Sequence, residues 1–334
     1  MPAPFPPRRL PGLADVPHAI PYQGSKRQLA HAIVPLLAPD TARLLEPFAG
    51  SAAVAIAARH LRIGETAEIS DVNEPLMRLW QRVLAEPVAL ADDYERLWHE
   101  QLTDPRAYYD AVRTRFNETH EPHCLLYLLA RCVKAAVRYN REGGFNQGPD
   151  RRRLGARPAA MRARLTATAR VLVGCRAYAA DYADVLAQAG PGDVVYLDPP
   201  YEGVSRARDH RYMAGMPREA FVARLREAVG RGTSFLLSYD GLSRDPAAGE
   251  RSYGEPLPAD LDLLHLHLDA GTSSQGTLNG RPARTIESLY LSPALVTRLG
   301  GPEAVHAALT GVPAPPPDLL DVGLSHRKSG ARIR

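Results

Sequence analysis

The chain has 334 residues, 45% hydrophobic and 23% charged, and a formal net charge of +4. This composition is typical of a globular protein with one large or two modest domains. No stretch approaches the ~18 uninterrupted apolar residues of a membrane span, and the N-terminal residues lack the apolar run of a secretory signal. Three cysteines (Cys124, Cys132 and Cys175) without metal-ligand spacing argue against a disulfide framework and a structural zinc site. We therefore expect a cytoplasmic protein without a metal.

Positive charge is concentrated between Arg131 and Arg176. Twelve cations and two anions give this segment a charge of +10, so that the rest of the chain carries −6. Such a local excess is expected of a surface that contacts a phosphate backbone. A solvated, arginine-rich helical face is the alternative interpretation.

Between a flexible Pro-rich arm (1–20) and a flexible basic tail (311–334), helical and strand patterns alternate. The alternation predicts an α/β fold, a mostly parallel, doubly wound sheet with helices on both faces. The helical block 86–170 is inserted into it. The predicted strands are 43–46, 67–71, 171–173, 194–198, 234–239, 263–268 and 287–291. The predicted helices are 25–37, the Ala-rich segment capped by Ser51, 73–85 and the whole of 88–137.

A polar residue ends each of four predicted strands. These residues are Glu46, Asp71, Asp198 and Tyr239. Ligands of such sheets bind beyond the carboxyl ends of the strands, so we expect all four side chains to face one crevice.

The segment Glu46-Pro-Phe-Ala-Gly-Ser51 follows the first predicted strand. Gly50 permits a tight turn and a close approach of a ligand to the backbone, and the following helix adds free N–H groups. The phosphate-binding patterns G-x-x-x-x-G-K-[ST] and G-x-G-x-x-G are absent.

Asp71 ends the second predicted strand. An acid at this position commonly accepts hydrogen bonds from a ribose hydroxyl. Helix capping through Asn73 is the alternative.

The segment Asp198-Pro-Pro-Tyr201 follows the predicted strand 194–198. Two prolines cannot continue a ladder and fix φ, so they hold the carbonyl groups of the turn outward. Asp198 and the Pro199 carbonyl can accept the two N–H bonds of a planar amino group, while Tyr201 stacks on its ring. The candidate catalytic residues are Asp198, Pro199, Pro200 and Tyr201.

With these motifs the sequence resembles the Dam-like class of DNA adenine-N6 methyltransferases, over roughly residues 20–292. The motifs of the family occur in its order. They are Tyr22-Gln-Gly-Ser-Lys26, Glu46 to Ser51, Asp71-Val-Asn73, Val112-Arg-Thr-Arg-Phe-Asn117, Arg138-Tyr-Asn140, Phe145-Asn146, Asp198 to Tyr201 and Asn279-Gly-Arg with Glu287-Ser-Leu.

The resemblance implies a Rossmann-like methyltransferase domain (21–85 and 171–300) that uses S-adenosylmethionine, with an inserted target-recognition domain (86–170) carrying a β-hairpin at 138–153. It implies no covalent intermediate, so no reactive cysteine is needed. The candidate cofactor-binding residues are Tyr22, Gly24, Lys26, Glu46, Pro47, Phe48, Gly50, Ser51, Asp71, Asn73, Asp181 and Asp198.

The implied partner is double-stranded DNA, from which the target adenine is flipped into the site. The loop 202–216 is a candidate lid. Arg151 to Arg153 are expected to contact phosphates, and turn chemistry beside Gly143-Gly144 is the alternative for Asn140 and Asn146. The candidate DNA-binding residues are Arg115, Arg138, Asn140, Arg141, Asn146, Arg151, Arg152 and Arg153.

Two departures from the family stand out. Ala52 replaces a second glycine; because an alanine that opens a helix needs only a negative φ, we expect cofactor binding to be kept. Lys134-Ala-Ala136 replaces an Asn-Gly in the DNA-reading region, so the frequent GATC preference of the family does not carry over.

Other functions stay open on the residues alone. They are methylation of cytosine N4, methylation of adenine in RNA, and DNA binding by an inactive relative, which the intact Lys26, Asp71 and Asp198 argue against. A protein-glutamine methyltransferase would favour Asn at position 198. A restriction endonuclease or another defence system is a further candidate partner of a nucleoid-associated enzyme.

Overall fold

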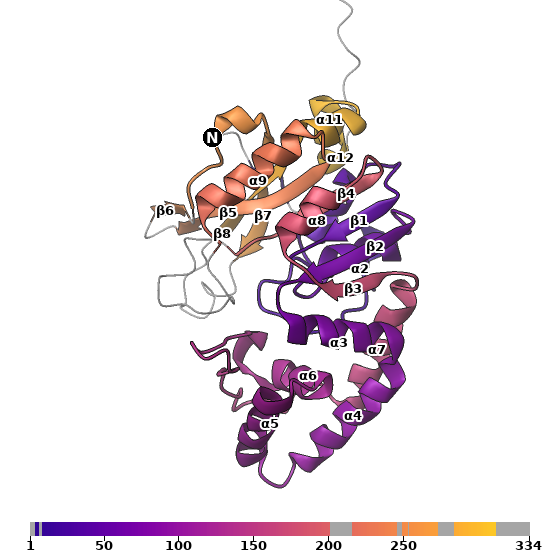
Figure 1. Cartoon of the computed structure of the whole chain (residues 1–334), viewed down its shortest axis with the longest axis vertical. Coiled ribbons are helices and arrows are strands. Elements are labelled where there is room, and N and C mark those ends of the chain that lie inside the picture. Colours follow the sequence, from indigo (N-terminus) through magenta and orange to yellow (C-terminus); the bar gives the residue numbers. More distant parts are fainter. Residues whose placement is uncertain are drawn as a thin grey trace, which may run out of the picture.

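The computed structural model describes residues 4–6, 9–200, 216–245, 249–252, 254–272 and 284–311. A twisted sheet with helices on both faces forms one half of the molecule, and the helices α3 to α7 lie beyond the β3 edge of that sheet (Figure 1). No helix among the described residues is long and apolar enough to cross a membrane.

The described strands form one sheet in the order β3-β2-β1-β4-β5-β8-β7, with β6 paired to β5. The first five strands of this order are parallel, whereas β8 runs antiparallel to both of its neighbours. The predicted α/β sheet is therefore confirmed, with an antiparallel end. The strands are β1 (Arg43–Glu46), β2 (Thr66–Asp71), β3 (Arg176–Ala179), β4 (Asp193–Leu197), β5 (Phe235–Asp245), β6 (Gly249–Ser252), β7 (Leu264–Thr272) and β8 (Arg284–Leu291).

Prolines divide the predicted helical block into separate helices. Pro87, Pro105, Pro122 and Pro158 each occupy the first helical position, where the missing N–H costs nothing. The helices are α1 (Ala30–Ile33), α2 (Ala53–His60), α3 (Glu74–Ala85), α4 (Pro87–Glu100), α5 (Pro105–Thr119), α6 (Pro122–Arg131), α7 (Pro158–Val171), α8 (Tyr182–Gln188), α9 (Arg218–Gly230), α11 (Pro293–Arg298) and α12 (Pro302–Thr310), with short 3-10 turns at Pro11–Leu13, Val34–Leu36, Val133–Ala135 and Ala259–Leu261.

Two apolar cores lie on the two faces of the sheet. Alternate residues of β1 point to opposite sides, with Leu44 in the larger core and Leu45 in the smaller one, beneath α8 and α9. The larger core continues without interruption into the helical block, where Tyr94 and Tyr127 are fully buried. The inserted helices therefore share their packing with the sheet.

The structure corrects two predicted elements. The apolar run 171–173 is not a strand, because α7 continues to Val171 and Val173 is 72% exposed. The strand on this edge is β3, whose half-exposed residues carry no apolar pattern. The helix predicted over 25–37 begins only at Ala30 and becomes a 3-10 turn from Val34.

The described residues of the N-terminal segment pack against the fold and do not form the free arm that we expected. Phe5 donates its N–H to His267 and accepts the N–H of Asp269, which adds a bridge to the edge strand β7. Its ring packs edge-on against His306, with centroids 5.0 Å apart, and Ile20 is buried. The tail beyond residue 311 lies outside the described residues.

Candidate active site

Asp198 directly follows β4 and forms an ion pair with Lys26. The Lys26 Nζ lies 3.0 Å from Oδ1 of Asp198, and the two side chains are only 12% and 19% exposed. Lys26 comes from the loop before α1, so this pair joins the N-terminal segment to the centre of the sheet. Pro199 is buried and Pro200 half-buried; Tyr201 lies outside the described residues.

A further carboxylate, that of Glu287, acts on both members of the ion pair. Burial raises the pKa of Asp198 to about 6, against the effect of Lys26, and Glu287 of β8 adds to the rise. Burial alone would lower the pKa of Lys26, but Asp198 and Glu287 outweigh it and raise that pKa. At neutral pH the lysine is therefore a cation and Asp198 an acceptor. Glu287 lies in the last segment that matches the family, where the sequence indicated no role for it.

Gly50 lies in a tight loop between β1 and α2. Its φ is +45°, and a Cβ at this position would lie 3.1 Å from the ring of Tyr22. The indole N–H of Trp80 donates to the Gly50 carbonyl at 3.0 Å, and the Gly50 N–H donates to Asp71 at 3.4 Å. The loop is thus held by two hydrogen bonds, and any side chain in place of Gly50 would crowd the Tyr22 ring. Gly24, with φ +83°, turns the chain just after that ring.

Asp71 organises the adjoining turn. Its carboxylate also accepts the N–H of Asn73 at 3.0 Å, and burial raises its pKa. Asn73 in turn accepts the N–H of Leu76 at 3.2 Å and so caps α3. The capping alternative is therefore confirmed for Asn73.

Glu46 is 3% exposed and accepts the N–H of Ala55 in α2 at 2.7 Å. Burial raises its pKa to about 8, so it is mostly protonated at neutral pH. Pro47 beside it is buried. The prediction that Ser51 caps α2 is wrong. Its hydroxyl instead lies 2.7 Å from that of Ser25.

The aromatic ring of Phe48 stacks on Tyr182 with centroids 5.2 Å apart. Asp181 is exposed and caps α8 by accepting the N–H of Ala183 at 2.8 Å. The expectation that Tyr239 faces the crevice is wrong. It is 3% exposed and stacks on Phe221 in the smaller core.

Ala52 occupies a left-handed backbone position. Its φ is +50° and ψ +38°, just before the first residue of α2. Our expectation of a negative φ is therefore wrong. A side chain raises the energy of this conformation, which explains why the resembling family places a glycine here.

The predicted hairpin is present as two isolated bridges, Cys132 with Pro149 and Tyr139 with Phe145. Asn140 accepts the N–H of Glu142 and of Gly144, at 3.1 and 2.7 Å, so its side chain forms the turn. Asn117 of α5, which we had given no role, holds the hairpin by bonding both backbone groups of Phe145.

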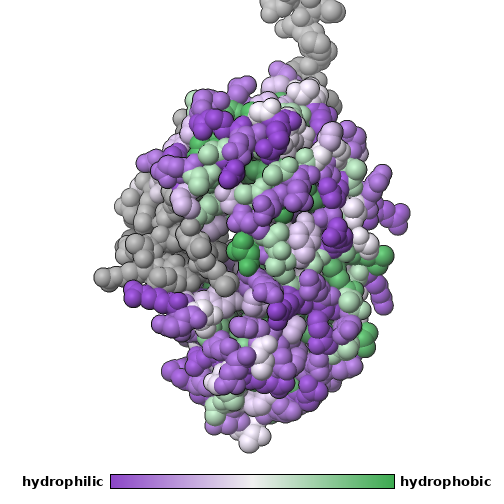
Figure 2. Space-filling view, in the orientation of Figure 1, coloured by the Kyte–Doolittle hydropathy of each residue, from purple (hydrophilic) through white to green (hydrophobic). Residues whose placement is uncertain are grey.

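We call the exposed cations of residues 134–153 the hairpin surface. Its members are Lys134, Arg138, Arg141, Arg151, Arg152 and Arg153, together with exposed Asn146. Within the described part of the chain, no ion pair involves the first five; Arg153 lies 3.7 Å from Asp150. The helical half of the molecule is mainly hydrophilic on the face shown in Figure 2.

Other cations of the basic segment bind the protein itself. Arg131 is 3% exposed and donates to the carbonyls of Asp150 and Arg153. Arg162 pairs with Asp92 and Glu95, and Arg176 with Glu68. Outside that segment, Arg115 of α5, a predicted DNA contact, pairs with Glu121. These residues therefore add less to an outward field than the count of charges indicates.

Two hydrogen bonds connect the hairpin with the crevice, and the motifs did not reveal either. The Gln23 N–H donates to the Ala135 carbonyl at 3.0 Å, and the Tyr139 hydroxyl donates to Asn73 at 3.3 Å. Lys134 and Ala135 both have a positive φ, at the place where the sequence departs from the family.

Acidic side chains at the carboxyl ends of parallel strands, in a sheet of this order with an antiparallel end, identify a Rossmann-like methyltransferase fold. The particular family follows from the sequence match. Residues 22–248 match the family described as D12 class N6 adenine-specific DNA methyltransferase, and the chain belongs to that family.

Relatives from phage and bacteria agree with this assignment. The DNA N-6-adenine-methyltransferase of Escherichia phage P1 is 29% identical over 61% of this chain, which spans only 27% of that protein. The DNA adenine methylase of Vibrio cholerae is 26% identical over 65% of the chain and 79% of its own length. The Retron Ec67 DNA adenine methylase of Escherichia coli is 31% identical over 49% of this chain and 57% of its own length.

Among solved structures, a putative methyltransferase yhhF from Escherichia coli aligns over 82% of this chain and 89% of its own. The sequence identity is 13% and the TM-score 0.30. That score is too low to bear on the fold, which the strand order defines.

Proposed function

We propose that the chain transfers a methyl group from S-adenosylmethionine to the N6 amino group of an adenine flipped out of double-stranded DNA. The observation that carries the proposal is the buried Asp198, followed by two prolines and held by Lys26 next to the Gly50 loop. An acceptor at the end of β4 and the Gly50 loop at the end of β1 lie on neighbouring strands.

The crevice fits a cationic donor. S-adenosylmethionine supplies an electrophilic methyl group on a sulfonium when it is bound. The Gly50 backbone lies against the Tyr22 ring with no side chain between them, and Asp71 and Asp198 provide the acidic groups of the crevice. We assign the ribose to Asp71 and the closing of the pocket to Tyr22 and Lys26.

The acceptor amine is a weak nucleophile because its lone pair is delocalised into the purine. Hydrogen bonds to the Asp198 carboxylate and the Pro199 carbonyl favour the pyramidal geometry in which that lone pair is available. Lys26 keeps Asp198 oriented and ionised, since it donates to Oδ1 at 3.0 Å. Stacking of the purine on Tyr201 stays a prediction.

Residues 86–170 form the target-recognition domain in this proposal. The hairpin surface contacts phosphates through Arg151 to Arg153, while Arg138, Arg141 and Asn146 reach base edges. Contacts of this kind offset the few kcal/mol needed to flip a base. Because DNA is the substrate, we propose a cytoplasmic location at the nucleoid, with an associated endonuclease or defence system as a candidate partner.

The substitution Asp198→Ala tests the catalytic assignment. We expect methyl transfer to a DNA duplex to be abolished, while DNA affinity changes little because the hairpin surface is intact. Incorporation of labelled methyl groups, followed by detection of N6-methyladenine, measures the first, and duplex binding the second. Unchanged turnover would refute the assignment, and label in cytosine would favour the N4 alternative.

A titration with S-adenosylmethionine separates the enzyme from an inactive relative. We expect binding at micromolar concentration, because the residues of the crevice are in place before a ligand arrives. DNA binding without any binding of the donor would instead favour a DNA-binding protein that has lost activity.

A further inference from the structure

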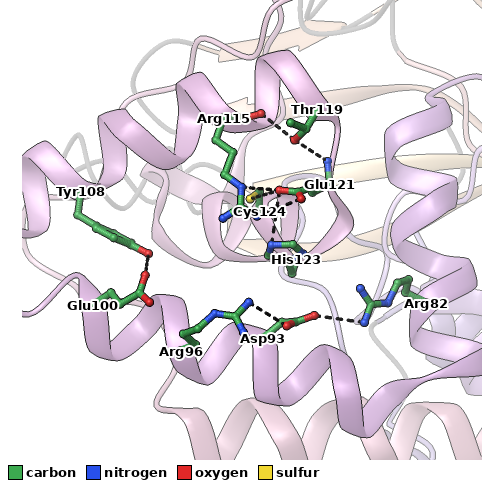
Figure 3. A network of polar contacts seen from close by, with 10 residues as sticks. All are labelled: Arg82, Asp93, Arg96, Glu100, Tyr108, Arg115, Thr119, Glu121, His123 and Cys124. Carbon is green, nitrogen blue, oxygen red and sulfur yellow. Dashed lines mark hydrogen bonds and ion pairs between the residues drawn. The ribbon is translucent and has the colours of Figure 1, made fainter.

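A compact group of three side chains with metal-ligand chemistry lies at the corner between α5 and α6, outside the site described above. Glu121 precedes α6, and His123 and Cys124 lie in its first turn. Their ligand atoms all lie within 4.8 Å of one another, and the three side chains point toward one another from this corner (Figure 3).

The geometry of the group centres on one carboxylate oxygen. Oε2 of Glu121 lies 3.6 Å from Sγ of Cys124 and 3.7 Å from Nε2 of His123. In a tetrahedral zinc site the bond lengths of 2.0 to 2.3 Å separate two ligand atoms by about 3.3 to 3.5 Å. These two spacings therefore exceed those of a zinc site by only a few tenths of an ångström, and the third, between the thiol and the imidazole, is at most 4.8 Å.

His123 lacks the hydrogen bonds that a buried imidazole needs. It is 7% exposed, and neither ring nitrogen has a hydrogen-bond partner among the described residues. A buried polar group left in this state costs roughly 1–3 kcal/mol. The nitrogen nearer to Glu121 is directed at the same carboxylate oxygen as the buried thiol, so a ligand placed between them would satisfy it.

We propose that Glu121, His123 and Cys124 bind a divalent transition-metal ion of the Zn²⁺ class. Carboxylate, imidazole and thiolate are the three ligand types that Zn²⁺ takes in proteins. On binding, a bond forms between the metal and Sγ, and the proton of the thiol passes to water. A water molecule fills the fourth position from the side of Glu121, whose side chain is 33% exposed.

Arg115 supports the carboxylate in this site. Its guanidinium lies 3.0 Å from Oε1 and 2.5 Å from Oε2 of Glu121. When the metal takes Oε2, the bond to Oε1 can stay and orient the ligand, as outer-shell partners of metal sites commonly do. All three ligands lie between Glu121 and Cys124, so the bound ion would stabilise the first turn of α6, and the Arg115 ion pair would connect the site to α5. It would overturn our expectation of no metal.

The test uses the full chain, stripped of metal with a chelator and titrated with Co²⁺ and then Zn²⁺. We expect one equivalent of Co²⁺ to bind and to produce a thiolate-to-cobalt charge-transfer band, which Zn²⁺ abolishes by displacement. We also expect Zn²⁺ to raise the melting temperature. Absence of the band at saturating Co²⁺ would overturn the proposal.

Variants locate the site. Cys124→Ser should remove the band and, because even an outer-shell change typically costs 10–100-fold, weaken binding by roughly tenfold or more. The matched control is Cys132→Ser, a buried cysteine of the same domain that should leave the band unchanged. If Cys124→Ser does not fold, Glu121→Gln replaces it. Because this ligand is partly exposed, the substitution should fold and should weaken metal binding comparably. A band that survives in Cys124→Ser, or disappears in Cys132→Ser, would refute the site.

Discussion

The crevice and the hairpin surface hold their charges in opposite ways. In the crevice, Lys26 and Asp198 are largely buried and bonded to each other, and Asp71 and Glu46 accept backbone N–H groups. On the hairpin surface, Arg138 and Arg151 are exposed without an ion pair in the described part of the chain. The crevice is therefore organised before its ligands bind, whereas the hairpin surface leaves its charge available to a polyanion.

The two regions nevertheless form one structural unit. The bonds from Gln23 to Ala135 and from Tyr139 to Asn73 connect the hairpin to the loops of the crevice. A shared core underlies both. A change in the hairpin can thus reach the donor site through these two contacts. A variant that loses DNA binding but keeps binding of the donor is therefore a demanding test of separate roles.

The largest effect should come from removing the three adjacent arginines, Arg151→Ala, Arg152→Ala and Arg153→Ala together. Each lost phosphate contact reduces the salt dependence of DNA binding by about 1 in the log–log slope. Three contacts correspond to roughly a hundredfold loss of affinity near physiological salt. Duplex binding at several salt concentrations, with unrelated sequences, measures both quantities.

Arg162→Ala is the matched control for that triple variant. This arginine belongs to the same basic segment, but Asp92 and Glu95 already hold it. We expect DNA affinity to change little. A loss confined to one DNA sequence in the triple variant would make its arginines base readers, and an equal loss in the control would remove the distinction between exposed and held cations.

Gly50→Ala tests the organisation of the crevice. The new Cβ would lie 3.1 Å from the Tyr22 ring at a φ of +45°, so the ring must move and the loop is strained. We expect an affinity for S-adenosylmethionine about tenfold lower, a change of about 1.4 kcal/mol, measured by calorimetry. Gly174→Ala, also at a positive φ but with nothing within 4 Å, should keep the affinity. Equal affinities in the two variants would contradict a crowded loop.

The sequence alone predicted the elements that bear strong local patterns. The apolar residues of β1 and β4, the end of β4 before Asp198-Pro-Pro and the cap at Asn73 each follow from a few adjacent residues. β3 was misplaced because an exposed edge strand needs no apolar residues, and the nearby run 171–173 supplied a false signal.

The candidate site was harder to predict wherever partners are distant in sequence. That Trp80 holds Gly50, or that Glu287 acts on Lys26, depends on tertiary packing, which leaves no periodic pattern. Tyr239 was placed in the crevice by its position at a strand end, but alternation along β5 sends its ring to the opposite core. Backbone dihedrals such as that of Ala52 are likewise invisible in residue types.

Glu46→Gln tests the consequence of burying an ionisable group. Glu46 is buried, whereas the arginines of the hairpin surface are exposed. The pKa of Glu46 in the folded protein is about 8, above its ordinary value of 4.5. Between these values the folded protein keeps a proton that the unfolded chain has released, so stability falls as pH rises. The slope is about 1.4 kcal/mol per pH unit. A glutamine does not titrate, so the variant escapes this loss. In urea titrations, the free energy of unfolding of the variant minus that of the wild type should rise by about 1.4 kcal/mol from pH 6 to pH 7. Parallel pH dependence of the two proteins would show that Glu46 is ionised in the fold.

Ala52→Gly addresses the smallest difference, the strain stored where the crevice loop enters α2. Both Ala52 and Ala57 are buried, so replacing either by glycine removes one packed methyl group and adds backbone freedom to the unfolded chain. At Ala52 the substitution also relieves a left-handed conformation that costs a side chain roughly 1–2 kcal/mol. Ala52→Gly should therefore destabilise the protein by about 1 kcal/mol less than Ala57→Gly in thermal or urea unfolding. If both variants lose equal stability, the loop carries no strain at Ala52, and the glycine of the family must serve the approach of the donor instead.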